Sequence, residues 1–108
     1  MFDKFLKKHK FKEPKNQAVF TCLHIIKENK PILYVKHDDE GDWQFLCREN
    51  HTTEDARIIA LQEIIDIDPS VSKVSNLKCG QTAVRERKES KWNLLWGTFM
   101  TKDEFIKL

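Results

Sequence analysis

The alternation of apolar and polar residues predicts a β-sheet. Residues 18–26 form an apolar run rich in β-branched and aromatic side chains, which favours a strand, although so apolar a run also fits a helix. Residues 32–37 and 43–47 predict two further strands. The five residues between them include Gly41, which can adopt positive φ, so this pair is typical of a β-hairpin.

The spacing of apolar residues becomes helical after the hairpin. A Thr-Thr-Glu-Asp sequence at residues 52–55 supplies a cap and an acidic first turn, and the apolar positions up to residue 64 fall on one helical face. We expect this main helix to end by Asp68, because a proline disfavours helical geometry in the residue before it. Asp68 and Pro69 then predict a short second helix through about residue 74.

The remaining elements lie towards the two ends of the chain. Phe2, Phe5, Leu6 and His9 have helical spacing among lysines, which predicts a short amphipathic helix that ends before proline 14. Near the other end, the pattern predicts a fourth strand over 82–87, an extended or packed segment over 92–96, and a final helical turn over 103–108.

These elements together predict one α+β domain over residues 1–108. We expect a small antiparallel sheet of about three to five strands, with one main helix packed on it and a short N-terminal helix. Residues 1–15 would form a basic amphipathic N-terminal segment, 18–92 the core, and 93–108 a C-terminal extension. A chain of 108 residues with 40% apolar residues is long enough for one packed core.

The length of the apolar runs and the number of cysteines indicate the cellular compartment of the protein. The most apolar run, 18–26, is far shorter than the roughly 20 residues that cross a bilayer, so we expect no membrane span. Cys22, Cys47 and Cys79 form no CxxC pair, and an odd number of cysteines is typical of free thiols in a reducing compartment. We therefore expect a cytoplasmic protein with mostly buried thiols.

Charge is unevenly distributed along the chain, although the net charge is only +2. Residues 1–15 and 73–91 are basic, whereas residues 37–55 carry seven carboxylates against one arginine. These patches can complement one another across the surface, or one of them can form a binding face. Nucleic-acid association through 73–91 and the nearby tryptophans is an alternative, but Glu86 and Glu89 interrupt that basic run.

Our leading hypothesis is a non-catalytic binding or protein-interaction module whose most distinctive feature is the acidic hairpin. The candidate binding residues come from this hairpin and from the basic segment: His37, Asp38, Asp39, Asp42, Trp43 and Arg85. Trp43 could anchor a partner beside the carboxylates. Its spacing of two from Phe45 also allows the ring to point into the core.

The second hypothesis is a small metal-binding or thiol-dependent enzyme. Its candidate ligands are the soft and imidazole side chains Cys22, His24, His37, Cys47 and His51, which zinc prefers. We expect Cys22 and His24 to share one face of a strand. The alternative is that the cysteines are core residues and the histidines lie at strand ends.

Other chemistry has little support in the sequence. With only three glycines, the chain contains neither a dinucleotide fingerprint nor a P-loop, so we expect no nucleotide cofactor. Asp38, Glu40 and Asp42 have the spacing of calcium ligands, but Trp43 occupies the position where a calcium loop needs glycine. The sequence sets neither an oligomeric state nor the identity of a partner.

The segment Pro-Ile-Leu-Tyr-Val-Lys-His-Asp-Asp-Glu-Gly-Asp-Trp-Gln-Phe-Leu-Cys at 31–47 resembles a family of small uncharacterised bacterial proteins that share His-Asp-x-x-Gly-Asp-Trp-Gln-Phe-Leu-Cys. Further matches lie at His51, at 55–57 and at 68–70. The resemblance runs from about residue 31 to Trp92 and implies a bacterial, cytosolic protein of unassigned activity. This chain departs from the family pattern at Gln81, where an aromatic residue would follow Gly80, and in its tail beyond Trp92.

Overall fold

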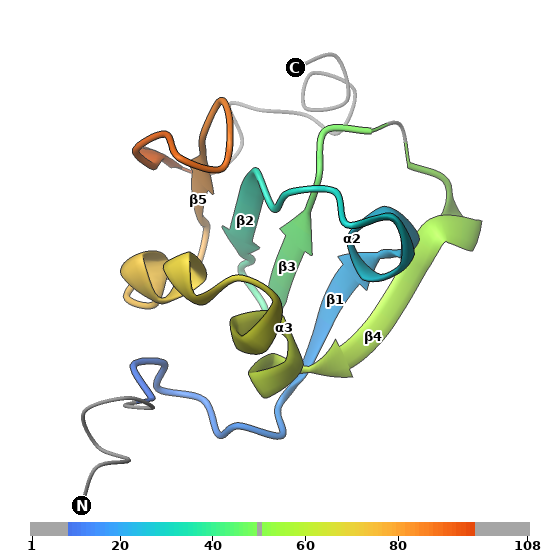
Figure 1. Ribbon diagram of the computed structural model, residues 1–108. Helices are drawn as coiled ribbons and strands as arrows, with labels where there is room; N and C mark the ends of the chain where they lie inside the picture. Colours follow the sequence, from blue (N-terminus) through green and yellow to red (C-terminus); the bar gives the residue numbers. More distant parts are fainter. Residues whose placement is uncertain (1–8, 50, 97–108) are drawn as a thin grey trace, which may run out of the picture.

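The computed structural model describes residues 9–49 and 51–96, which form a sheet with short helical segments (Figure 1). In chain order the elements are β1 (Ala18–Cys22), α2 (Leu23–Glu28), β2 (Tyr34–His37), β3 (Trp43–Leu46), the 3-10 helix η1 (Thr53–Asp55), β4 (Ala56–Ala60), α3 (Leu61–Ile67), the 3-10 helix η2 (Pro69–Val74), β5 (Gln81–Val84) and β6 (Asn93–Trp96).

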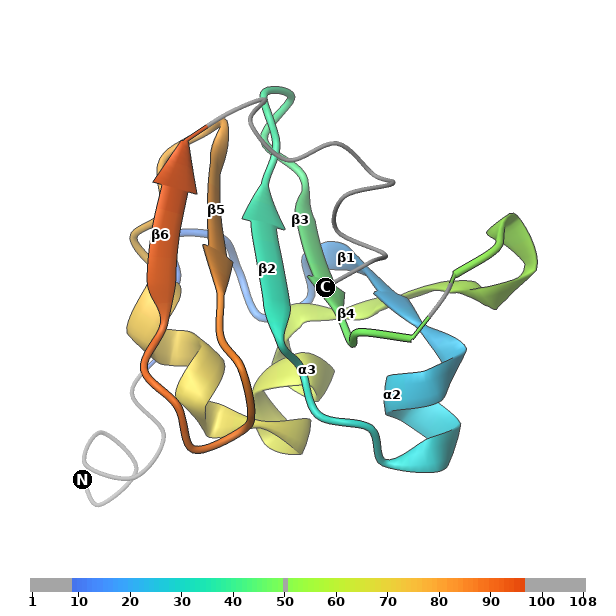
Figure 2. The same ribbon diagram turned by 90° about the horizontal axis from the view of Figure 1, so that it is seen from above.

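The six strands form one mixed sheet in the order β4-β1-β3-β2-β5-β6, which Figure 2 shows from β6 at one edge towards β4 at the other. β1 runs parallel to β3, and every other neighbouring pair is antiparallel. The predicted α+β class is confirmed. The predicted antiparallel sheet of about three to five strands is wrong in size and in pairing, because α2 and β2 carry the chain back to lay β3 parallel to β1.

The apolar run at 18–26 is divided between a strand and a helix. β1 ends at Cys22, and α2 starts at Leu23 and buries Ile25. Asn29 ends α2 in the left-handed conformation (φ 57°), which asparagine tolerates better than most residues. The prediction of one continuous strand is therefore wrong. In a run of apolar residues, the polar positions that would distinguish the two-residue period of a strand from the 3.6-residue period of a helix are missing.

The predicted main helix is also divided. Residues 56–60 form β4, which pairs with the whole of β1 in the register Val19↔Ile59, and only α3 is α-helical. The acidic cap exists, but on the 3-10 turn η1, where the Thr52 backbone N–H donates to Asp55 Oδ2 at 3.0 Å. Pairing with β1 overrides the local helical pattern here.

The hairpin prediction is confirmed. His37 pairs with Trp43, and Gly41 has φ 90° in the turn between them. Asp38 Oδ1 accepts hydrogen bonds from the backbone N–H groups of Glu40 and Asp42, both at 2.9 Å, so this side chain builds the turn. The predicted short second helix is present as η2, with Asp68 Oδ1 accepting from the Ser70 backbone N–H.

The last strands agree with the prediction in part. β5 stops at Val84 rather than reaching residue 87, because the chain bends at residues 86 and 87 and then turns, with the Ser90 N–H donating to the Arg87 carbonyl oxygen at 2.9 Å. The segment at 92–96 is extended and forms the edge strand β6. The predicted N-terminal helix lies outside the described residues up to residue 8, and its last part is wrong, because residues 9–13 are not helical and the chain bends at 11–13. The final helical turn lies wholly outside the described residues.

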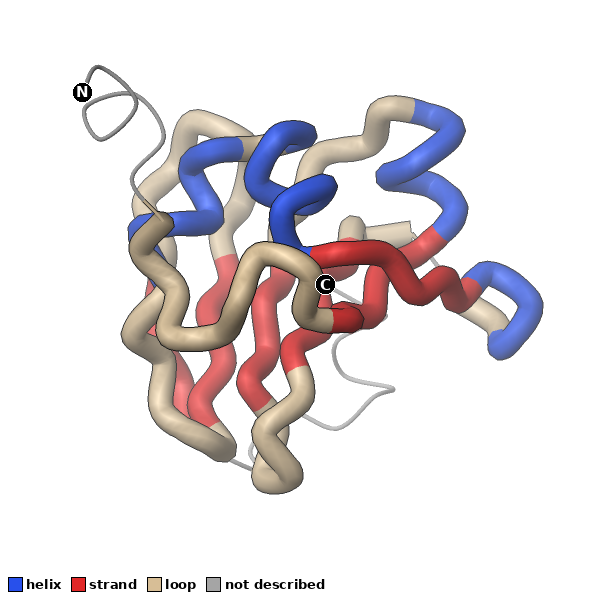
Figure 3. Tube along the Cα trace, turned by 90° about the horizontal axis from the view of Figure 1, so that it is seen from below, coloured by secondary structure: helices blue, strands red, loops and turns tan. Residues whose placement is uncertain are grey.

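The core lies between one face of the sheet and the helical segments, most of which gather along one side of the sheet in Figure 3. Its largest fully buried side chains are Trp43, Phe45, Ile25, Ile32, Leu61 and Ile64. Cys22, Cys47 and Cys79 are free thiols, of which the first two are buried. Among the described residues, no helix is both long and apolar enough to cross a membrane.

Candidate metal centre

Four of the five candidate ligands meet at one end of the sheet. The ligand atoms of Cys22, His24, Cys47 and His51 all lie within 4.8 Å of one another. Cys47 Sγ is 3.6 Å from Cys22 Sγ, 3.7 Å from His24 Nδ1 and 3.4 Å from His51 Nε2. The His24 and His51 rings are 5.5 Å apart between centroids.

The parallel pairing of β1 and β3 produces this meeting. Parallel strands end at the same edge of a sheet, so Cys22 at the end of β1 and Cys47 just after β3 become neighbours. His24 lies in the first turn of α2, two residues after Cys22, rather than on the strand face that the sequence predicted. His51 comes from the loop that leads from β3 to β4.

The three distances from Cys47 Sγ to the other ligand atoms match those around a tetrahedral zinc ion. Zn–S bonds of about 2.3 Å and Zn–N bonds of about 2.0–2.1 Å place neighbouring ligand atoms of a tetrahedron roughly 3.3–3.8 Å apart. The three distances from Cys47 Sγ, 3.4 to 3.7 Å, lie in this range. Two thiolates and two imidazoles are a donor set that zinc prefers, and the protein alone supplies all four positions.

A hydrogen bond joins the two buried sulfur atoms and shifts the pKa values of Cys22 and Cys47 in opposite directions. The hydrogen bond from the Cys47 thiol lowers the pKa of Cys22 to about 4, against the opposing effect of burial. The same hydrogen bond, followed by burial, raises the pKa of Cys47. The pair therefore holds one thiolate near neutral pH, and a bound metal would displace the remaining proton.

Groups around the four side chains hold them in place. The Glu49 backbone N–H donates to Cys47 Sγ at 3.4 Å. A hydrogen bond from the Thr52 backbone is the largest cause that lowers the pKa of Asp55, and the charges of His24 and His51 lower it further. A carboxylate beside metal-binding histidines commonly orients them and strengthens them as ligands.

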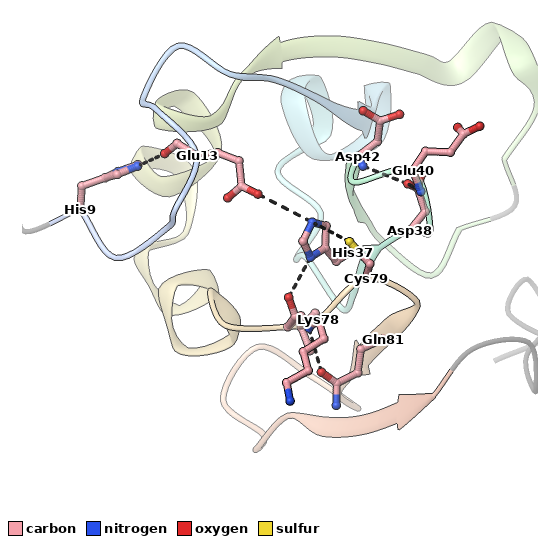
Figure 4. Close-up of polar contacts among 10 residues, drawn as sticks. His9, Glu13, His37, Asp38, Glu40, Asp42, Lys78, Cys79 and Gln81 are labelled. Atoms are coloured by element: carbon pink, nitrogen blue, oxygen red, sulfur yellow. Dashed lines mark hydrogen bonds and ion pairs between the residues drawn. The ribbon is translucent and has the colours of Figure 1, made fainter.

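His37, the fifth candidate ligand, belongs to a different place in the fold. Its Nδ1 is 2.8 Å from the Leu77 carbonyl oxygen, and its Nε2 faces Glu13 Oε2 at 3.7 Å and Cys79 Sγ at 4.0 Å (Figure 4). Its ring stacks on Trp43 with centroids 4.1 Å apart. Glu13 could not be assigned to this group from the sequence, because residues 13, 37 and 79 meet only through the tertiary fold.

The other candidate binding residues divide into exposed and buried ones. Asp39 is exposed, and Asp38 and Asp42 are partly exposed with Glu40 beside them. Carboxylate oxygens of Asp38, Glu40 and Asp42 lie within 4.8 Å of one another. Trp43 is only 1% exposed and packs against Phe11 and Phe45, so its ring points into the core.

Arg85 is also buried and engaged within the fold. Its Nη2 donates to Asp68 Oδ2 at 2.6 Å, and its Nε donates to the Ile32 carbonyl oxygen at 3.0 Å. Its guanidinium lies over the Trp92 ring, 4.1 Å from the centroid. This arginine therefore joins β5 to η2 rather than presenting its charge at the surface.

A groove of about 550 Å³ lies over the sheet face opposite the core and begins at the candidate metal centre. Cys22 and His51 line one end, and Asp38, Glu40 and Asp42 line the hairpin end. The floor between these ends is formed by side chains of β1, β2 and β3: Phe20, Tyr34, Lys36, Gln44 and Leu46.

A scan against protein-family models, a search of curated proteins and a search of solved structures each return no match for this chain. The resemblance of residues 31–47 to a bacterial family thus stays a prediction, and the geometry of the four candidate metal ligands is what indicates a function.

Proposed function

We propose that this protein is a zinc-binding interaction module in which Cys22, His24, Cys47 and His51 hold one structural, non-catalytic zinc ion. The observation that carries the proposal is the convergence of four soft and imidazole ligand atoms within 4.8 Å from two separate segments of the chain. Two buried cysteines packed for apolar reasons alone need no pair of histidine nitrogens facing them.

The zinc ion would fasten the connection between β3 and β4. Cys22 and His24 belong to the β1–α2 junction, whereas Cys47 and His51 lie in this connection. Within the described part of the sheet, β4 pairs only with β1. A metal that joins the two segments therefore holds the edge of the sheet together.

Four protein ligands favour a structural role for the ion. Catalytic zinc sites keep one position open for water or substrate, whereas structural sites fill all four with protein side chains. A filled tetrahedron supports the interaction module over the metal-dependent enzyme.

The groove is the surface that we propose for a partner. Its floor includes the apolar side chains of Phe20, which is 38% exposed, and Leu46, and its hairpin end carries Asp38, Glu40 and Asp42. A basic peptide segment with apolar side chains complements this combination of charge and shape. Lys36 in the floor would pair with a carboxylate or carbonyl of the same segment.

Metal analysis of the purified, tag-free protein tests the metal centre. We expect about one zinc ion per chain, and we expect a strong chelator to expose two thiols that react slowly before its addition. Cys47→Ser should abolish stoichiometric zinc, whereas Cys79→Ser, a cysteine outside the cluster, should retain it. Metal-free protein whose thiols react equally with and without chelator would refute the zinc centre.

A peptide-binding measurement tests the interaction surface separately. The probe is a fluorescent peptide of alternating lysine and leucine residues, with a glutamate–leucine peptide as its counterpart. We expect the zinc-loaded protein to bind only the basic peptide, and Glu40→Lys/Asp42→Lys to weaken this binding about tenfold or more. Glu89→Lys, an exposed charge reversal outside the groove, should leave binding unchanged. Equal binding by both variants would refute the groove as the site.

A further inference from the structure

A second group of reactive side chains lies away from the candidate metal centre. Cys79 is an exposed thiol in the turn that leads into β5, and its Sγ is 4.0 Å from His37 Nε2. His37 is buried, on β2, and Glu13 Oε2 faces the same nitrogen at 3.7 Å. Three distant segments thus bring a thiol, an imidazole and a carboxylate together (Figure 4).

The hydrogen bond at the other ring nitrogen determines which nitrogen can act as a base. His37 Nδ1 lies 2.8 Å from the Leu77 carbonyl oxygen, which can only accept, so Nδ1 carries the hydrogen. In the neutral ring, Nε2 then bears the free electron pair and faces the Cys79 thiol. The stack against Trp43, at 12° between the ring planes, fixes the orientation of the imidazole.

The carboxylate has a clear electrostatic role in this arrangement. When Nε2 takes the thiol proton, the imidazole becomes positively charged, and Glu13 stabilises that charge from 3.7 Å. Only one oxygen of Glu13 faces the ring. The other, Oε1, is buried and has no hydrogen-bond partner among the described residues.

A cavity of about 480 Å³ opens beside these side chains. Glu13, His37, Trp43 and Cys79 line it. Trp43 is 1% exposed, and its Nε1–H meets no acceptor within the described residues. Buried N–H groups without an acceptor are rare, and this one is buried too, so a small shift of the cavity wall would let it donate to an oxygen atom of a ligand.

We propose that Cys79 is a nucleophilic thiol, that His37 is its general base, and that the cavity takes a small acyl thioester. Once the cavity wall shifts to admit it, the carbonyl oxygen of such a compound would accept a hydrogen bond from the Trp43 Nε1–H group. This site is independent of the zinc centre: it shares no side chain with it and would remain if the zinc proposal failed.

The reaction is an acyl transfer between two sulfurs. The Cys79 S–H proton moves to His37 Nε2, and Sγ forms a bond to the carbonyl carbon. The bond from that carbon to the leaving sulfur then breaks, and the leaving thiolate takes the proton from Nε2. Atoms and electrons balance without an oxidant, and the product is acylated Cys79 with a free small thiol.

The test measures acylation of the purified full-length protein by S-phenyl thioacetate near neutral pH. Mass spectrometry counts acetyl groups and locates them by peptide mapping, and a synthetic peptide of residues 76–82 provides the rate of an unassisted cysteine. We expect one acetyl group at Cys79, added about a hundredfold faster than to the peptide, which is the lower end of what a positioned base contributes. Cys79→Ser should remove it.

Two variants separate the roles of the other side chains. His37→Gln should reduce the rate to that of the peptide, and circular dichroism reports whether this variant folds. Glu13→Gln changes a partly exposed side chain, so it decides the question even if His37→Gln fails to fold. We expect Glu13→Gln to slow acylation and to shift its pH profile. Acylation no faster than that of the peptide, or unchanged by Glu13→Gln, would overturn the proposal.

Discussion

Arg85 and Asp68 form a buried ion pair, with Nη2 and Oδ2 2.6 Å apart and both side chains at most 5% exposed. The pair joins the start of η2 to the end of β5, and Arg85 Nη1 adds a hydrogen bond to Ser70 Oγ at 3.0 Å. Removing one partner leaves the other charge buried and unpaired. We therefore expect Asp68→Asn to lower the free energy of unfolding by about 3–5 kcal/mol in urea denaturation at neutral pH. A loss below about 1 kcal/mol, the value of an exposed pair, would contradict this role.

The same pair predicts a pH dependence. Burial by itself would raise the pKa of Asp68, but hydrogen bonds from Ser70 and Arg85 outweigh it, so the pKa in the folded protein is lowered. The stabilisation is therefore fully present above the unfolded-state pKa, near 3.8, and is lost as the pH falls through the folded-state pKa. We expect the urea midpoints of the wild type and Asp68→Asn to converge in acid. A constant difference down to about pH 2 would contradict this.

Metal binding should also stabilise the protein by mass action. At a free zinc concentration a thousand times the dissociation constant, we expect zinc to add about 4 kcal/mol to the free energy of unfolding. Affinity should fall as the pH falls, because protons compete for the thiolates and imidazoles. Thermal unfolding with stepwise zinc addition measures the effect, and Cys47→Ser should remove it. A melting temperature independent of zinc would contradict it.

Without metal, the two buried thiols should be open to oxidation. Cys22 Sγ and Cys47 Sγ are 3.6 Å apart and need approach each other by only about 1.5 Å to form a bond near 2.05 Å. We expect diamide, which takes two electrons and two protons from the thiols, to form this disulfide in chelator-treated protein. The zinc-loaded protein should resist this oxidation, because both sulfur atoms would be bound to the metal. Peptide mapping identifies the linkage, and a disulfide that involves Cys79 instead would contradict the expectation.

Two glycines provide a matched test of backbone strain. Gly41 and Gly80 both have φ near 90°, where residues with side chains are strained. A Cβ at Gly41 would meet nothing within 4 Å, whereas a Cβ at Gly80 would lie 2.8 Å from Asp39 Oδ1. We expect Gly41→Ala and Gly80→Ala each to cost about 1 kcal/mol in the free energy of unfolding, because the exposed Asp39 side chain can rotate away from the new Cβ. A larger cost at Gly80 that Asp39→Ala removes would contradict this expectation.

Local pairings could be predicted from the sequence, and distant ones could not. The partners His37 and Trp43 are separated by one short turn, so their strand pattern and Gly41 predict the hairpin. The partners Val19 and Ile59 are 40 residues apart, and nothing in the pattern at 56–60 indicates that β1 will form a ladder with it. Local spacing therefore predicted a helix where the sheet takes a strand.

The candidate metal centre shows the same division. Residue type alone singled out Cys22, His24, Cys47 and His51, but their arrangement depends on the parallel pairing of β1 with β3, which no local pattern specifies. His37 was grouped with them because it is a histidine near the hairpin. Its place on β2 takes it to Glu13 and Cys79 instead.

The position of the four ligands along the chain has a consequence for biosynthesis. All of them lie between residues 22 and 51, ahead of β5 and β6. Synthesis proceeds from the N-terminus, so a nascent chain on the ribosome could capture zinc before β5, the second partner of β2, has been made. The ion would then hold β1 beside β3 and offset the entropy that is lost when the chain between them closes into a loop. The later strand β5 would pair with a β2 edge that is already ordered.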